Sequence, residues 1–448
     1  MKNVFASFAA FVRRTEVMGV ITSIVIKAVS ILSAFLLFTL SARVLGEEQF
    51  GQFALFFSAA SMVSVAAVFG QEMLIVRVWN EHIAAGRLDL VKGGIVFGLA
   101  VSAAGGALGA AVMGLIVFFY HSFAAALSAS VFVAVAVFLL FLSSLARSVV
   151  SILMGDGQRE MTAFLPANLG LGICLALSLS LSVTWVVNLL TLGMVLAVAC
   201  QIFYLLRVLR RTQPDIFKSS WSYTPEIWFP SSLRLWGASM LEVSNQYLDV
   251  ILVGYFLDPV AAGAYFVTTR LANGFASVAD AFNTFAMRQF PELYYKRDNV
   301  GLVRLLQTLA ILTGLAVVSG LVVVGFAGDW LLLIFGEEYM GYYHVLLILC
   351  LGTAVLAATG PAAPVLMLTG HEGAYLRIVA ISVLVRAVGF VFVVPLFGIV
   401  GAASTTAVSL LVMAVLVSIK AQVSTGYNVT ATRVLTDWYS GRIKVREL

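Results

Sequence analysis

The residues of this sequence that can do chemistry are charged side chains inside long apolar stretches. A charge in the hydrocarbon core of a bilayer is costly, so an ionisable residue there is a functional candidate by default. The candidates are Lys27, Arg234, Glu242, Asp249, Arg270, Asp280 and Arg386. The four cations suit an anionic ligand such as a pyrophosphate. The three carboxylates suit either exchange of a coupling proton or sodium ion, or pairing with the cations.

Several of these charges recur at helical spacing. One predicted helix face carries Arg234, Ala238, Glu242, Asn245 and Asp249. A second carries Arg270, Asn273, Ser277, Asp280 and Thr284. A lipid-facing helix would not carry such faces, so they either line a polar cleft or form structural ion pairs. Lys27 lies in the same way on a face of small and polar residues.

Two cations are open to more than one interpretation. Lys27 either attracts a pyrophosphate in a central cavity, or snorkels or pairs with a carboxylate. Arg386 is isolated in its apolar stretch and is either a cavity cation or a member of an internal ion pair. Its planar guanidinium suits bidentate contact with phosphate better than a lysine does.

The elements that position these residues are predicted to be transmembrane helices. Hydrophobic residues make up 61% of the 448 residues and charged residues only 11%, well below the roughly 25% charged residues of a soluble domain. Apolar runs of about 20 residues, without strand-like alternation, predict membrane-spanning helices. Twelve spans are predicted, at residues 17–40, 53–73, 93–119, 127–146, 163–183, 184–206, 232–257, 261–287, 301–326, 345–368, 378–395 and 398–419. Pro361 and Pro364 interrupt the tenth.

The distribution of Lys and Arg predicts the orientation. Of the 27 Lys and Arg, four lie well inside predicted spans (Lys27, Arg234, Arg270 and Arg386), and Arg43 is the one that falls in a loop on the second side. All the others fall on the first side, which the positive-inside rule assigns to the cytoplasm. Both termini are therefore expected in the cytoplasm. The same bias explains the net charge of +5, so no nucleic-acid partner is expected.

An internal repeat divides the chain into two halves. Leu45, Gly51 and Phe53 match Leu257, Gly263 and Tyr265 at one constant offset. We expect an N-terminal lobe at 1–211, a cytoplasmic linker at 212–230, a C-terminal lobe at 231–420 and a cytoplasmic tail at 421–448. Six spans per lobe make a parallel repeat, which suits alternating access with a substrate site between the lobes.

Motifs at the span ends carry a family resemblance that covers essentially the whole chain. They are residues 43–46 (RVLG), 51–53 (GQF), 260–265 (VAAGAY), 290–293 (FPEL) and 395–402 (PLFGIVGA). The sequence resembles the Wzx-like polysaccharide flippases of the multidrug/oligosaccharidyl-lipid/polysaccharide (MOP) exporter superfamily. The resemblance implies an all-α MOP fold. It also implies flipping of an undecaprenyl-pyrophosphate-linked oligosaccharide across a bacterial inner membrane, for O-antigen, capsule or exopolysaccharide.

Two other functions compete with that of a flippase. A multidrug or cation antiporter of the same superfamily would favour a carboxylate-rich cavity, whereas the mid-membrane cations favour an anionic cargo. A membrane enzyme of polysaccharide assembly is disfavoured by short outer loops and by the lack of a nucleophile–histidine pair. No ATP-binding loop or zinc-ligand spacing is present, so neither an enzyme activity nor a cofactor is expected. The expected partners are lipid-linked oligosaccharide, membrane lipids and the polysaccharide polymerase machinery.

Overall fold

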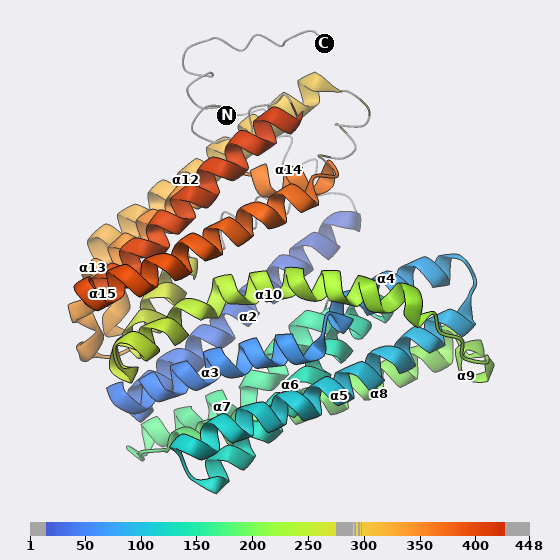
Figure 1. The fold of residues 1–448 in the computed structure, drawn as a ribbon, viewed down its shortest axis with the longest axis horizontal. Helices are drawn as coiled ribbons and strands as arrows, with labels where there is room; N and C mark the ends of the chain where they lie inside the picture. Colours follow the sequence, from blue (N-terminus) through green and yellow to red (C-terminus); the bar gives the residue numbers. More distant parts are fainter. Residues whose placement is uncertain are drawn as a thin grey trace. The chain divides into compact units, whose positions relative to one another are not determined.

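The computed structural model describes residues 15–151, 153–274 and 298–425, together with residues 290, 293 and 296. Side chains are described from residue 28 onward, apart from a few positions around 300–310 and at 368 and 425. Every regular element in these residues is a helix (Figure 1). Eight of these helices are long and apolar enough to cross a membrane. The chain is therefore an all-α, multi-pass membrane protein, as its composition predicts.

The helices form two compact units. Unit 1 comprises Met1–Gly46 and Ala59–Val243, and unit 2 comprises Glu47–Ser58 and Ser244–Leu448. Two long helices, α3 (Glu47–Val68) and α10 (Pro225–Phe256), contribute residues to both units. The division of the sequence into lobes at residues 211 and 231 stays a prediction.

Unit 1 is built from helices joined by short connections. Its elements are α2 (Thr15–Leu45), α4 (Gln71–Ala84), α5 (Leu88–Tyr120), α6 (Phe123–Val149), the π-helical turn η1 (Leu153–Gly157), α7 (Gln158–Ala176), α8 (Val183–Thr212) and α9 (Asp215–Lys218). α5 packs against α4 and α6, α6 also packs against α8, and α7 packs against both α2 and α8. Ser122 caps α6 by accepting a hydrogen bond from the amide of Ala125.

Unit 2 contains helical residues 259–274, α12 (Asn299–Leu333), η2 (Glu337–Tyr342), α13 (Tyr343–Ala357), α14 (Ala362–Leu368) and α15 (Glu372–Thr425). α13 packs against both α12 and α15, and the three run side by side in Figure 1. α15 joins two predicted spans across Gly398, whose φ of 59° breaks the helix. This break confirms the predicted boundary at residues 395–398.

A close backbone approach fixes the start of α3 within unit 2. A Cβ atom on Gly51 would overlap the carbonyl group of Pro259, and one on Gly263 would lie 3.0 Å from the Cα of Gly51. These glycines are the matched pair of the internal repeat. Their contact seats residues 47–58 on helical residues 259–274, and so places Phe50 and Phe53 in the interior of unit 2.

Each of the twelve predicted spans coincides with helical residues over most of its length, with the eighth described as far as residue 274. The fifth, predicted to end at residue 183, ends with α7 at Ala176. The predicted break in the tenth is confirmed, because α13 ends at Ala357 and α14 begins at Ala362. The prediction of a continuous second span from 53 to 73 is wrong. Phe69 and Gly70 have φ values of 54° and 72° and separate α3 from α4. At this break the backbone of Ser232 lies close to Gly70. A Cβ atom on Gly70 would overlap the carbonyl oxygen of Ser232.

Candidate functional site

Unit 2 contains a buried ion pair. Arg386 on α15 and Asp249 on α10 are separated by 137 residues in the sequence, and they are only 2% and 5% exposed. Nη1 of Arg386 lies 3.4 Å from Oδ1 and 3.3 Å from Oδ2 of the carboxylate. Of the two interpretations open for Arg386, the structure therefore shows the internal ion pair.

Two hydroxyl groups surround the carboxylate of Asp249. Thr406 on α15 donates to its Oδ2 at 2.9 Å. The Tyr265 hydroxyl, from helical residues 259–274, lies 2.8 Å from Thr406 Oγ1 and 3.4 Å from the same carboxylate oxygen. Both residues are buried. A buried carboxylate is stable only when it is paired and hydrogen-bonded, and here α15 and residues 259–274 supply both conditions.

Oxygen acceptors also surround the guanidinium of Arg386. Nε donates to Oγ of Ser409 at 2.8 Å, and Nη1 donates to the carbonyl oxygen of Asn245 at 3.2 Å. Ser409 Oγ in turn donates to the carbonyl oxygen of Thr406. Nη2 is buried and makes no hydrogen bond to any residue that the structure describes. The arginine is therefore held by α10 and by the second half of α15 together.

Arg270 lies on an aromatic platform. Its guanidinium carbon is 4.9 Å from the ring centre of Tyr247 and 4.7 Å from that of Phe266. These rings belong to a wider cluster with Phe57, which stacks edge-on against both. The half-buried cation is thus stabilised by the negative faces of two rings. The sequence prediction missed this platform, because its rings come from three separate segments.

The polar face predicted on α10 divides between the two units. Arg234 and Glu242 belong to unit 1 and are exposed, and Asp249 belongs to unit 2 and is buried. Nε of Arg234 donates to the carbonyl oxygen of Pro230 on its own helix, at 3.2 Å. Glu242 therefore does not share the buried surroundings of Asp249.

Two candidates cannot be placed fully. Lys27 lies on α2, but its side chain is outside the described part of the structure, and Asp280 lies outside the described residues altogether. Their roles stay predictions.

Unit 1 has polar contacts that the sequence prediction did not single out. Gln71 donates to Oγ of Ser232 at 2.8 Å, and Ser239 donates to Oε1 of Glu72 at 2.7 Å. Oε2 of Glu72 is buried without a hydrogen-bond partner among the described residues. The sequence could have indicated these contacts, because Glu72 is a charged residue inside the predicted second span. These bonds tie the first half of α10 to the start of α4.

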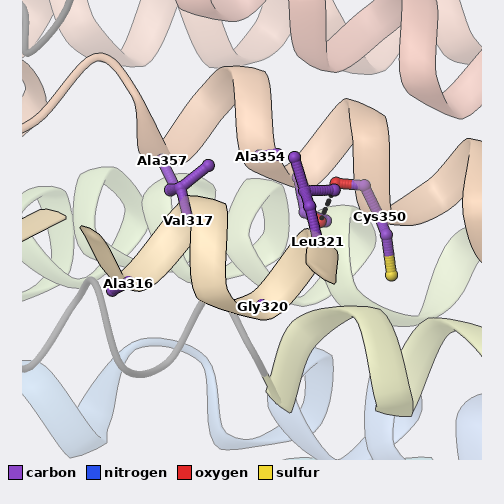
Figure 2. A pocket seen from close by; sticks show the side chains of 8 residues that line it. Ala316, Val317, Gly320, Leu321, Cys350, Ala354 and Ala357 are labelled. Atoms are coloured by element: carbon purple, nitrogen blue, oxygen red, sulfur yellow. Dashed lines mark hydrogen bonds between the residues drawn. The ribbon is translucent and has the colours of Figure 1, made fainter. Parts of the chain in front are cut away.

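A small pocket lies between α12 and α13 (Figure 2). Small apolar side chains line it, together with Thr353 and the buried thiol of Cys350. The Thr353 hydroxyl donates to carbonyl oxygens of its own helix at 3.1 Å. The pocket therefore offers no free polar group for a charged or sugar ligand.

Comparison with known proteins identifies the fold. No protein-family model matches the sequence, and no curated protein matches it. An inward-facing multidrug resistance MATE family transporter of the MOP superfamily matches with a TM-score of 0.72 at 13% identity, over 90% of this chain and 96% of that one. The lipid II flippase MurJ, in an inward closed conformation, matches with a TM-score of 0.69 at 13% identity, over 96% of this chain and 94% of that one.

A third neighbour is a MOP superfamily transporter from Pyrococcus furiosus, for which a reverse polarity of the binding pocket is described as suggesting a different function. It matches with a TM-score of 0.60 at 13% identity, over 92% of this chain and 95% of that one. At such identities the likeness establishes the fold, which these MOP superfamily transporters share, and leaves the function to be argued from the residues.

Proposed function

We propose that this protein is a flippase that moves an undecaprenyl-pyrophosphate-linked oligosaccharide across the bacterial inner membrane by alternating access. The exported glycan would serve the synthesis of a surface polysaccharide such as O-antigen, capsule or exopolysaccharide. Both termini lie in the cytoplasm in this proposal, and polysaccharide polymerase machinery receives the product.

The observation that carries the proposal is the presence of two arginine side chains inside unit 2. Away from the helix ends, the described side chains of this unit include two cations, Arg270 and Arg386, and one carboxylate, Asp249. Arg386 neutralises Asp249 in the buried pair. Arg270 presents a second guanidinium, which lies on an aromatic platform. Guanidinium groups suit the phosphate groups of an anionic cargo better than they suit a cationic drug.

Two structural neighbours give this interpretation support. One is a flippase of lipid II, a lipid-linked cargo, and it covers nearly the whole chain. Another is described as having a binding pocket of reverse polarity, which indicates that pockets in this fold differ in polarity. In the proposed mechanism, Lys27 and Arg270 draw the pyrophosphate into the protein, and the lipid tail stays in the bilayer.

The test is removal of both cations. Lys27→Ala combined with Arg270→Ala is expected to abolish surface polysaccharide, measured on intact cells, while the purified variant keeps the thermal unfolding midpoint of the wild type within a few degrees. Arg270→Lys is expected to retain part of the export, because it keeps the charge but loses the planar guanidinium.

A matched control removes an exposed cation elsewhere. Arg77 forms an exposed pair with Glu81 on α4, so Arg77→Ala is expected to leave export unchanged. Normal surface polysaccharide in the double variant would overturn the proposal. Loss of resistance to cationic drugs in that variant, with normal polysaccharide, would favour the antiporter instead.

A further inference from the structure

The ion pair in unit 2 has the composition of a cation site. The groups that face the guanidinium of Arg386 are both oxygens of the Asp249 carboxylate, the carbonyl oxygen of Asn245 and the hydroxyl of Ser409. A second hydroxyl, that of Thr406, lies 2.9 Å from Asp249 Oδ2. Carboxylate, carbonyl and hydroxyl oxygens are the ligands that hard metal cations take in proteins. In this structure the cation among these oxygen atoms is the guanidinium of Arg386.

The site needs a cation, whatever its source. Asp249 is 5% exposed, and an ionised carboxylate in such a place is destabilising unless an opposite charge and hydrogen bonds compensate it. The guanidinium of Arg386 supplies that charge. It is permanently protonated and is covalently part of α15, so it can neither dissociate nor hand on a proton.

The helix geometry keeps the guanidinium in place. Arg386 lies in the first half of α15, and Thr406 and Ser409 lie beyond the break at Gly398. The hydroxyl of Ser382, one turn before Arg386, donates to the carbonyl oxygen of Ser409 at 2.9 Å. The two halves of α15 are therefore joined around the arginine, and the acceptor atoms belong to helices.

We propose that Arg386 is a tethered counter-cation, which occupies a site that would otherwise bind a monovalent metal cation such as Na⁺. Two consequences follow. The wild-type protein takes no Na⁺ at Asp249, and deletion of the guanidinium creates a sodium site there. If the protein is a transporter, as proposed above, this carboxylate also does not couple a diffusible ion to transport, and this last statement rests on the proposed function. The occupancy of the site by Arg386 is independent of the proposed function.

The experiment measures thermal unfolding of the purified full-length protein in detergent, in sodium chloride and in choline chloride at equal ionic strength. The wild type is expected to unfold at the same temperature in both salts. Arg386→Ala, purified in sodium and then exchanged, is expected to lose several degrees in choline and to regain most of that loss when Na⁺ is restored, because a ligand that binds only the folded state stabilises it.

Two further variants separate a cation site from simple damage to packing. Arg386→Lys keeps a tethered charge and is expected to show no response to Na⁺. Asp249→Asn combined with Arg386→Ala removes both charges. It is expected to be more stable in choline than Arg386→Ala alone, and insensitive to Na⁺, because no unpaired buried charge is left.

Each contrary result counts against the proposal. A sodium-dependent midpoint in the wild type would show that the arginine does not fill the site. Equal stability of Arg386→Ala in the two salts, or failure to obtain that variant folded in sodium, would show that the oxygens do not form a cation site. The measurement needs no transported substrate, so its failure is distinct from a failure of the proposed function.

Discussion

The packing of unit 2 requires a glycine at position 51. A Cβ at this position would overlap backbone atoms of Pro259, which cannot move aside as a flexible side chain would. Gly51→Ala is therefore expected to lower the free energy of unfolding by about 1–3 kcal/mol, the usual cost of overpacking. The measurement is the thermal unfolding midpoint of the purified variant.

A control glycine lies in the same unit. A Cβ added to Gly325 on α12 would have no neighbouring atom within 4 Å, so Gly325→Ala is expected to be neutral or slightly stabilising. Equal stability of the two alanine variants would show that residues 47–58 do not pack closely on residues 259–274.

The residue scale is also where sequence prediction reaches its limit. The sequence shows that Asp249 and Arg386 each lie inside an apolar run, and helical spacing groups Asp249 with Arg234 and Glu242. Spacing along one helix cannot show which faces of distant helices meet. The pairing across 137 residues and the platform under Arg270 therefore needed the fold.

At the scale of elements, the short segment between α8 and α10 is docked on α5. Lys92 on α5 donates to the carbonyl oxygens of Phe217 and Ser219, at 3.2 and 2.8 Å. The amide and hydroxyl of Ser222 donate to the backbone and side chain of Asp89. A Cβ on Gly93 would meet the carbonyl oxygen of Ser222. The segment predicted as a linker, at 212–230, is thus docked on α5 rather than free.

Removal of the Lys92 ammonium tests this docking. Lys92→Met keeps the apolar stem but loses two hydrogen bonds, each worth about 0.5–1.5 kcal/mol. Limited proteolysis is expected to cut residues 213–224 several-fold faster in the variant than in the wild type. Lys218→Met, which removes an exposed charge from the same segment, is the control and is expected to leave the rate unchanged. Identical cleavage in all three proteins would contradict the docking.

The elements themselves are largely predictable, because lipid forces every apolar run of sufficient length into a helix. The break at residues 358–361 follows from Pro361 and Pro364. The break at Phe69 and Gly70 could not be predicted in this way, since a single glycine is common in membrane helices. At this break a segment more than 160 positions later in the sequence packs closely against the chain. Length and composition indicate spans, and tertiary contacts decide where they bend.

At the scale of the whole molecule, the fold is shared by proteins that move different cargoes. MOP superfamily transporters that match this chain include both a multidrug transporter and a lipid II flippase. Our proposal of a pyrophosphate-linked cargo rests on two side chains of unit 2. Arg386 pairs with Asp249, and the guanidinium of Arg270 lies on aromatic rings.

The most direct measurement is translocation by the purified protein in proteoliposomes. The cargo would be the host's own lipid-linked oligosaccharide, labelled on its sugar with a fluorophore that a membrane-impermeant reductant destroys. With the wild type, the reductant is expected to reach label from both leaflets. With Lys27→Ala combined with Arg270→Ala, it is expected to reach only the outer one. Wild-type vesicles that protect the inner-leaflet label as fully as protein-free vesicles would contradict the assignment of this protein as a flippase.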